Sequence, residues 1–227
     1  MMLSLLLLAF ASNAQQNDFK ESQNTDKNWF KNELKNTVFS LGVNNLANTD
    51  NNTNIPNLRP LASRYFSIAR EKSFILSKSK NAGLYLKTGV GVSWNNFMFD
   101  NNQTIVSTQN GVEFKESPVS LEKSKLTASY LNIPLALDLK FKNSFISHIS
   151  AGGYVGLNIG SHSKIKTVEN QKTKTNDNYF VNKTRYGISA ELGFRNSVDL
   201  FAHYDLNTVF QNSKGPQANV MSVGIRF

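Results

Sequence analysis

Strict alternation of apolar and polar side chains constrains the fold of this chain more than any other feature. In residues 130–141 every odd position is Leu, Ile or Phe, whereas the even positions from Asn132 to Lys140 are polar, small or proline. The last residues, 221–227, repeat the pattern and end on Phe227. A period of two predicts β-strands that present one apolar face and one polar face.

Eight segments follow this pattern, and the connections between them differ in length. Short connections, such as Lys142-Asn143-Ser144 and Arg195-Asn196-Ser197, alternate with mostly longer ones that are rich in Asn, Thr, Lys and Gly. Tight turns at one rim and long loops at the other are typical of a transmembrane β-barrel. The predicted strands cover residues 34–45, 61–76, 82–98, 125–141, 145–160, 179–194, 198–210 and 218–227, and the long connections are 46–60, 99–124, 161–178 and 211–217.

A soluble β-sandwich or a lipocalin-like barrel is the alternative fold. A soluble barrel turns its apolar face inward, whereas here the bulky Leu, Ile, Val and Phe face suits lipid. The opposite face combines Gly and Ser with charged residues, which suits a crowded lumen. The sequence therefore predicts an all-β fold, an eight-stranded antiparallel transmembrane up-and-down β-barrel over residues 34–227.

The amino-terminal residues resemble an export signal. An apolar run, Leu3 to Ala11, is followed by Ser12-Asn13-Ala14 and then by a polar stretch. Small residues at these positions predict a signal peptide over 1–14 that is cleaved after Ala14. Residues 15–33 are predicted to be a polar periplasmic lead-in. No stretch reaches 18 apolar residues, which excludes an α-helical membrane protein.

Composition excludes several chemistries and favours no cofactor or metal. The chain has no Cys, which removes disulfides and thiol nucleophiles, and its three His are far apart in sequence. The motifs Gly-x-Ser-x-Gly and His-Glu-x-x-His are absent. The net charge of +9 comes without any run of five basic residues. Such a diffuse excess does not favour nucleic acid and is more typical of a solubility feature or of a surface that faces anionic lipid.

Charged residues on the polar faces are predicted to form a paired network in the lumen, because buried charges persist only when paired. If Phe194 lies opposite Val198, the paired positions sum to 392, and Arg185 comes within one diagonal step of Asp205. This register predicts an ion pair between Arg185 and Asp205. The predicted network consists of Lys87, Asp138, His148, Arg185, Glu191, Asp205 and Arg226, with Tyr154 and His203 beside it.

Asp138, His148 and Ser150 could form a catalytic triad in the lumen, and the alternative is a structural pair of Asp138 and His148. If Phe141 lies opposite Phe145, Asp138 faces His148 and Ala136 faces Ser150. Side chains two positions apart on a strand are ~7 Å apart, too far for a direct hydrogen bond between Ser150 and His148. The trio also points away from lipid. We therefore predict no catalytic residue, and a structural role for Asp138 and His148.

Two of the long loops differ in charge. Residues 99–124 hold more acidic than basic side chains, whereas residues 161–178 hold Lys164, Lys166, Lys172 and Lys174 against Glu169 and Asp177. Three interpretations are open: the loops pair with each other, they bind surface polysaccharide, or they are simply solvated.

Several short motifs extend these predictions to a family. Tyr130-Leu131-Asn132-Ile133-Pro134-Leu135, Gly152-Gly153-Tyr154-Val155-Gly156 and Tyr204-Asp205-Leu206-Asn207, together with the terminal Phe227, resemble the eight-stranded outer-membrane β-barrels of Gram-negative bacteria, the PorT-like and OmpX-like "outer membrane protein beta-barrel domain" chains. The resemblance implies that Phe227 is the signal read by the barrel assembly machinery. It also implies extracellular long loops and periplasmic termini.

The expected function is that of a non-enzymatic barrel acting through its loops or periplasmic rim. Envelope integrity, adhesion or a secretion-apparatus accessory role would fit, with outer-membrane lipid and lipopolysaccharide, the barrel assembly machinery, and secretion or envelope proteins as partners. The alternative is a small conduit for hydrophobic or very small solutes. A lipid-modifying barrel enzyme ranks third.

Overall fold

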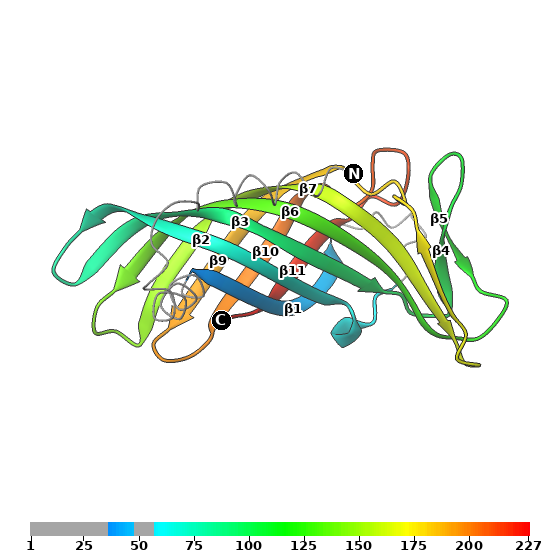
Figure 1. The fold of residues 1–227 in the computed structure, drawn as a ribbon, viewed down its shortest axis with the longest axis horizontal. Coiled ribbons are helices and arrows are strands. Elements are labelled where there is room, and N and C mark those ends of the chain that lie inside the picture. Colours follow the sequence, from blue (N-terminus) through cyan, green and yellow to red (C-terminus); the bar gives the residue numbers. More distant parts are fainter. Residues whose placement is uncertain (1–35, 48–56) are drawn as a thin grey trace, which may run out of the picture. The chain divides into compact units, whose positions relative to one another are not determined.

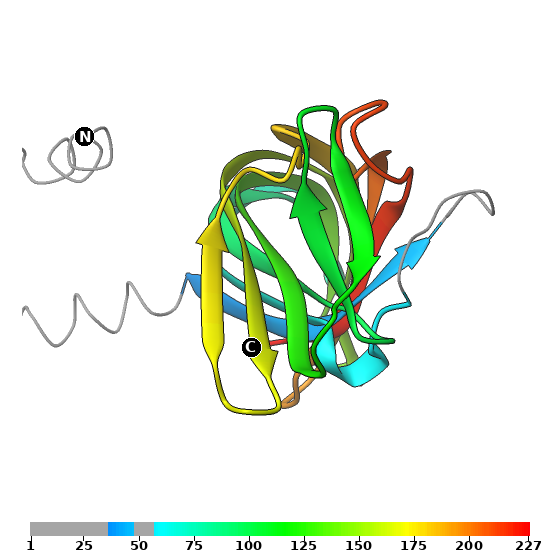
Figure 2. The same ribbon diagram turned by 90° about the vertical axis from the view of Figure 1, so that its right-hand side faces the viewer.

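The computed structural model describes residues 36–47 and 57–227. The predicted signal peptide and polar lead-in lie outside these residues. Eight long antiparallel strands form a closed barrel, in the ring order β1, β2, β3, β6, β7, β9, β10, β11 and back to β1 (Figures 1 and 2). These strands are β1 (Thr37–Ala47), β2 (Arg64–Lys78), β3 (Ala82–Met98), β6 (Leu121–Phe141), β7 (Ile146–Thr167), β9 (Thr184–Phe194), β10 (Asp199–Thr208) and β11 (Asn219–Arg226).

The barrel closes where the first strand pairs with the last. β1 and β11 are antiparallel, with Ser40 opposite Arg226. Beyond this pair, the backbones of Phe39 and Phe227 exchange two hydrogen bonds, of 3.2 and 3.0 Å. Closure satisfies the backbone groups that an open sheet would leave unpaired at its edges, which is the condition for a sheet to cross a membrane.

The two predicted faces are present and have the predicted sides. On β6 the apolar residues at odd positions point outward, and Leu135 among them is 55% exposed. The even positions point into the barrel, where Asp138 is 2% exposed. An apolar outside and a polar inside invert the pattern of a soluble barrel, so the lipocalin-like alternative is wrong. No helix among the described residues is long and apolar enough to span a membrane.

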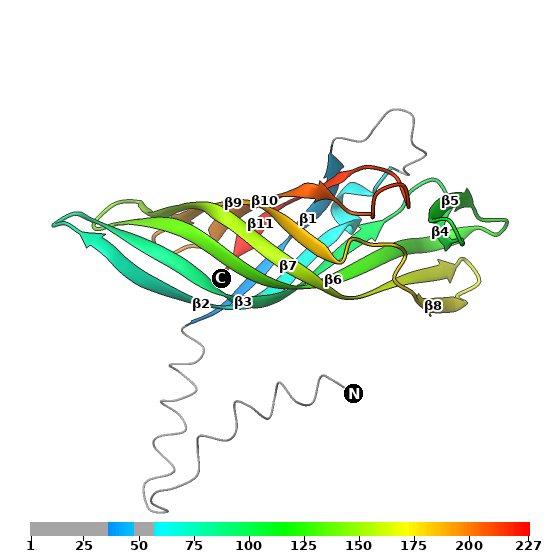
Figure 3. The ribbon, with the colours of Figure 1, turned by 90° about the horizontal axis from the view of Figure 1, so that it is seen from above.

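The long connections contain more strand than the sequence predicted. Residues 99–124 include a hairpin of β4 (Gln103–Ser107) and β5 (Val112–Glu116), and the strand expected from 125 begins at Leu121. Residues 161–178 include the end of β7 and a further strand, β8 (Lys172–Asn176), which pairs with it (Figure 3). A short 3-10 helix, Pro60–Ala62, precedes β2. β8 and the ends of β6 and β7 extend the barrel sheet at its loop end, whereas β4 and β5 form a separate two-stranded sheet.

Several strand boundaries and one register were predicted wrongly. The segment expected from residue 179 begins only at Thr184, because Tyr179 and Phe180 have φ angles of 47°, which no strand tolerates. On the β6–β7 hairpin Asp138 lies opposite Ser150 rather than His148, a shift of two residues. The connection is longer than the predicted tight turn, and Arg195 donates hydrogen bonds to the carbonyl oxygens of Phe141 and Ser144 within it, at 3.1 and 2.9 Å. The register of β9 and β10 is the predicted one.

Candidate functional site: the filled lumen and its cap

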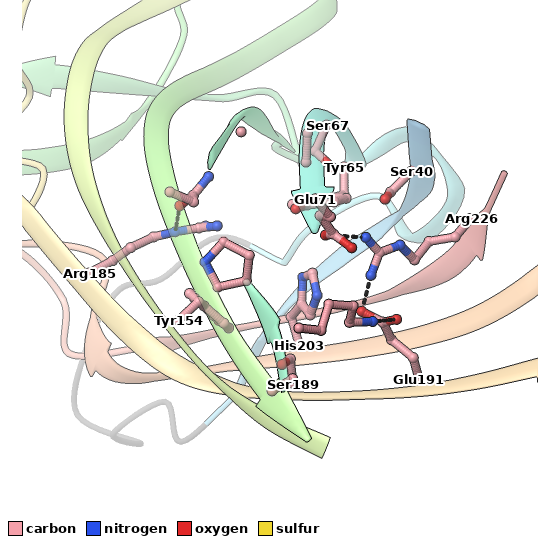
Figure 4. A pocket seen from close by; sticks show the side chains of 16 residues that line it. Ser40, Tyr65, Ser67, Glu71, Tyr154, Arg185, Ser189, Glu191, His203 and Arg226 are labelled. Atoms are coloured by element: carbon pink, nitrogen blue, oxygen red, sulfur yellow. Dashed lines mark hydrogen bonds and ion pairs between the residues drawn. The ribbon is translucent and has the colours of Figure 1, made fainter. Parts of the chain in front are cut away.

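The first interior cluster joins four strands through two carboxylates and two cations. Glu191 on β9 accepts hydrogen bonds from Lys87 on β3 and from Arg226 on β11 (Figure 4). Arg226 also contacts Glu71 on β2, with 2.5 Å between Nη2 and Oε1. Two cations thus face two anions. Because all four side chains are largely buried, this balance offsets part of the cost of removing the charges from water.

A second cluster surrounds Arg185 on β9. Its guanidinium lies 4.0 Å from the Asp205 carboxylate and donates to the side-chain oxygens of Asn132 and Ser93, at 2.9 and 3.3 Å. The rings of Tyr130 and Tyr154 lie within 4.7 and 5.1 Å of it. The Tyr154 hydroxyl donates to Asp205. Aromatic faces and oxygen acceptors together replace the water that a buried guanidinium would otherwise need.

The space left in the lumen is small. A cavity of about 50 Å³ lies between the two clusters and is bounded by both arginines and by His203 (Figure 4). That volume holds a few water molecules. The ring of His203 packs against Phe201 and Tyr154, with centroids 4.8 and 5.3 Å apart. Side chains therefore fill the cross-section in this part of the barrel.

The Asp138 and His148 pair expected from the sequence is not formed. Asp138 lies opposite Ser150 and is contacted by Lys140 at 3.5 Å. His148 lies opposite Lys140, and its Nε2 is 3.7 Å from Asp199 instead. Among the described residues, one Asp138 oxygen and the Ser150 hydroxyl have no hydrogen-bond partner. No Ser–His–Asp relay is assembled by these contacts.

An apolar plug fills the lumen above the Arg185 cluster, at the loop end. Phe97 on β3 and Leu126 on β6 point inward at positions that continue the polar faces of these strands, and Phe99, just after β3, is also buried. Residues of three loops complete the plug, so the polar interior gives way to a dry core. Its buried members are Phe97, Phe99, Ile105, Val112, Leu126, Ala128, Tyr130, Tyr179, Val181, Val209, Phe210 and Val220.

The β4–β5 hairpin closes over this plug. The Val112 amide donates to the Lys214 carbonyl at 2.7 Å, which ties the hairpin to the loop before β11. Phe114 packs edge-on against Phe99 and Phe210, with centroids 5.2 and 6.2 Å away. In Figure 2 the hairpin stands in front of the barrel mouth. The loop end is a packed cap rather than a set of separate loops.

Part of the plug and of the first cluster, which the sequence analysis did not predict, has a signal in the sequence. Phe97 and Phe99 keep the inward parity of β3, so their aromatic character signalled a filled end. Glu71 belongs to the first cluster but was not predicted, because alternation in its segment is less regular. The packing of the hairpin against Lys214 and Phe210 depends on contacts about 100 residues apart in sequence, and no local pattern encodes it.

Pairing between the loops of opposite charge, one of the three open interpretations, is seen at one residue among the described residues. Glu122 bonds Lys166 across β6 and β7. Asp100 instead contacts Arg59, at 3.3 Å, and Glu113 contacts its own neighbour Lys115, at 2.8 Å. Within the described part of the chain, no group of three or more His, Cys, Asp or Glu side chains could hold a metal ion.

A closed eight-stranded barrel with an apolar outside and a charged, filled inside defines a transmembrane β-barrel of the outer membrane. The family model described as "Outer membrane protein beta-barrel domain" matches residues 13–211. The chain belongs to this family, and with it to the bacterial outer membrane.

The chain is similar to Ail, the attachment invasion locus protein of Yersinia pestis, with 11% identity over 84% of this chain and 96% of that chain, and a TM-score of 0.29. No curated protein matches the sequence.

Proposed function

We propose that this protein is a non-enzymatic barrel, closed to solutes, that acts at the cell surface through its capped loop end. The filled lumen carries the proposal. Two charged clusters and an apolar plug occupy successive levels of the interior, and the cavity between the clusters holds only about 50 Å³. A conduit for solutes would need a continuous passage through all three levels.

The loop end is the more suitable part for contact with partners. Binding surfaces of barrels are generally built on loops held by a rigid scaffold. Here the hairpin, the 209–218 connection and the residues before β9 are packed together by Val112, Phe114, Phe180 and Phe210. A preformed surface loses less conformational entropy on binding than separate mobile loops would. This supports a role in adhesion or envelope integrity rather than in transport.

The proposed topology places the long loops outside the cell and both termini in the periplasm, after export directed by residues 1–14. Short turns on the periplasmic side are the rule for outer-membrane barrels. Phe227 ends the closing strand with its side chain exposed, which supports its role as the signal for the assembly machinery.

Conductance in planar bilayers tests the closed lumen. We expect the refolded protein to show no steady single-channel current under conditions in which a large-pore outer-membrane barrel, reconstituted in parallel, conducts. A reproducible ohmic current from the wild-type protein would contradict the proposal and favour the conduit.

The absence of cysteine makes the topology test simple, because any introduced thiol is unique. Gln109→Cys lies at the tip of the β4–β5 hairpin and Lys142→Cys lies at a short turn. A membrane-impermeant maleimide should label only Gln109→Cys on intact cells and both variants after lysis. Labelling of Lys142→Cys alone on intact cells would invert the topology.

A further inference from the structure

A grid of lysines covers the outward face of the sheet above the barrel. β6, β7 and β8 continue past the barrel wall as three antiparallel strands (Figure 3). Lysines on these strands lie directly opposite one another in two successive rows. The first row is Lys125, Lys164 and Lys174, and the second is Lys123, Lys166 and Lys172. We call these six residues the lysine face.

A register shift puts all six on one side of the sheet. Below the shift, the outward residues of β7 are odd-numbered and include Leu157 and Ile159. Tyr130 pairs with Asn158 and Ser129 pairs with Gly160, so Ile159 is the extra residue of a bulge. Above it the parity reverses: Ser163 is buried and contacts the Tyr179 hydroxyl at 2.6 Å. Lys164, which follows Ser163, and Lys166 two residues on therefore point outward, together with the lysines that lie opposite them on β6 and β8.

This arrangement is unfavourable for the protein by itself. Like charges directly opposite on neighbouring strands are destabilising. Among the described residues, Glu122 is the one carboxylate in ion-pair contact with the face, through Lys166 and Lys123. Partial burial and the positive charges of Lys164, Lys123 and Arg64 lower the pKa of Lys125. An external anion would relieve this repulsion.

The face also has room for such an anion. Five of its lysines, together with Met98 on β3, line a groove of about 310 Å³. Neighbouring strands are ~4.8 Å apart, and successive residues on one face are ~7 Å apart. The groove therefore offers ammonium groups at spacings that suit two or more phosphate groups on one molecule.

The height of the lysine face above the aromatic residues at the membrane interface indicates which molecules contact it. Phe66 and Trp94 stack outside the barrel with centroids 5.4 Å apart, and such aromatics mark the membrane interface. Trp94 lies opposite Ser129 on β6. Lys125 is four residues from Ser129 along the same strand, on the side of the loops. With a rise of ~3.3 Å per residue and a strand tilt of ~40°, the two rows lie ~10 and ~15 Å above this level. That is the layer of lipid headgroups.

We propose that the lysine face binds the phosphate groups of anionic glycolipid headgroups in the leaflet that surrounds the loop end. The face continues the lipid-contacting sides of β6 and β7, where Leu131 and Leu157 are exposed, so the adjacent molecules are lipids. The proposal deepens the function proposed above, because it names the surface by which the loop end is anchored among its neighbours. Its assignment to the outer leaflet rests on the proposed topology.

The test compares lipid retention by two matched triple variants. Lys125→Gln/Lys164→Gln/Lys174→Gln removes one row of the face. Lys78→Gln/Lys80→Gln/Lys142→Gln removes the same charge from exposed lysines at the short turns. Each refolded barrel, in zwitterionic detergent, is titrated with bisphosphorylated lipid A and the bound lipid is counted by native mass spectrometry. A heat-dependent shift on SDS gels verifies that each variant is folded.

We expect the row variant to bind lipid A about 10- to 100-fold more weakly than wild type, and the turn variant to bind like wild type. Removing both phosphates from lipid A should weaken binding to wild type similarly. Equal binding by both variants, or undiminished binding of dephosphorylated lipid A, would overturn the proposal. Displacement of lipid A by equimolar tripolyphosphate would overturn the lipid source and assign the face to soluble polyphosphate. None of these outcomes depends on conductance or topology, so failure here is distinguishable from failure of the proposed function.

Discussion

Arg226, on the last strand, contacts Glu71, on the second strand, across the first, with 2.5 Å between Nη2 and Oε1. The contact spans the seam at which β11 and β1 close the barrel. Arg226 bonds Glu191 as well, so one guanidinium connects both sides of the seam inside the lumen. Closure is therefore maintained by side chains in addition to the backbone pairing of β1 with β11.

Replacing Arg226 by Met is expected to destabilise the barrel strongly. The change leaves two buried carboxylates with one remaining cation, Lys87, and breaking a buried pair in this way costs about 3–5 kcal/mol. Urea unfolding in liposomes measures the loss. The control is Arg59→Met, which breaks an exposed ion pair with Asp100 and should cost at most about 1 kcal/mol. Equal losses for the two variants would show that the interior contact has no special role.

Arg185 and Asp205 are expected to be energetically coupled. Each of the single changes Arg185→Ala and Asp205→Ala leaves the other charge buried, whereas the double change removes both. The double variant should therefore be more stable than the sum of the single losses predicts, by about 1–3 kcal/mol. A double-mutant cycle read by urea unfolding measures this difference. Strictly additive losses would mean that the 4.0 Å approach contributes no coupling.

The eight barrel strands and their faces could be predicted because lipid and lumen impose opposite requirements on alternate residues. On β6, the odd-numbered residues from Leu131 to Leu139 face the lipid, and the even-numbered residues from Asn132 to Lys140 face the interior. The same parity, combined with a three-residue turn, was sufficient to bring Arg185 near Asp205. Period and turn length are both local in sequence, and this is why they succeeded.

The parts that could not be predicted depend on distant residues. The β6–β7 register differs from the predicted one by two residues, and Arg195, from another turn, donates hydrogen bonds to the carbonyls of Phe141 and Ser144 in this connection. His148 consequently faces Lys140 and lies near Asp199 rather than Asp138. The cap escaped prediction for the same reason, because Val112 and Phe114 enter the plug through contacts with Lys214 and Phe210, which are about 100 residues away in sequence.

The lipid face is expected to reject charge. Leu135 is near the middle of the apolar belt and points outward, so Leu135→Lys should cost about 2–4 kcal/mol of unfolding free energy. Ala136→Ser, one residue on, points into the polar lumen and should change stability by less than about 0.5 kcal/mol. Unfolding of both variants in the same liposomes gives the comparison. A harmless Leu135→Lys beside a severe Ala136→Ser would invert the assignment of the faces.

Acidification is expected to loosen the sheet that carries the lysine face. His162 lies in β7 beyond the membrane-spanning residues, and burial, followed by the charges of Lys174, Lys125 and Lys164, lowers its pKa below 6.5. Because the unfolded chain then binds the proton more readily, this residue's contribution to stability is present above pH 6.5 and is lost as the pH falls toward the lowered pKa. Amide hydrogen exchange in residues 162–176, corrected for intrinsic rates, should show weaker protection at pH 5.5 than at pH 7.5. His162→Gln should flatten this dependence, whereas His148→Gln, near the short turns, should leave it intact. A dependence that survives in His162→Gln would assign the effect to another group.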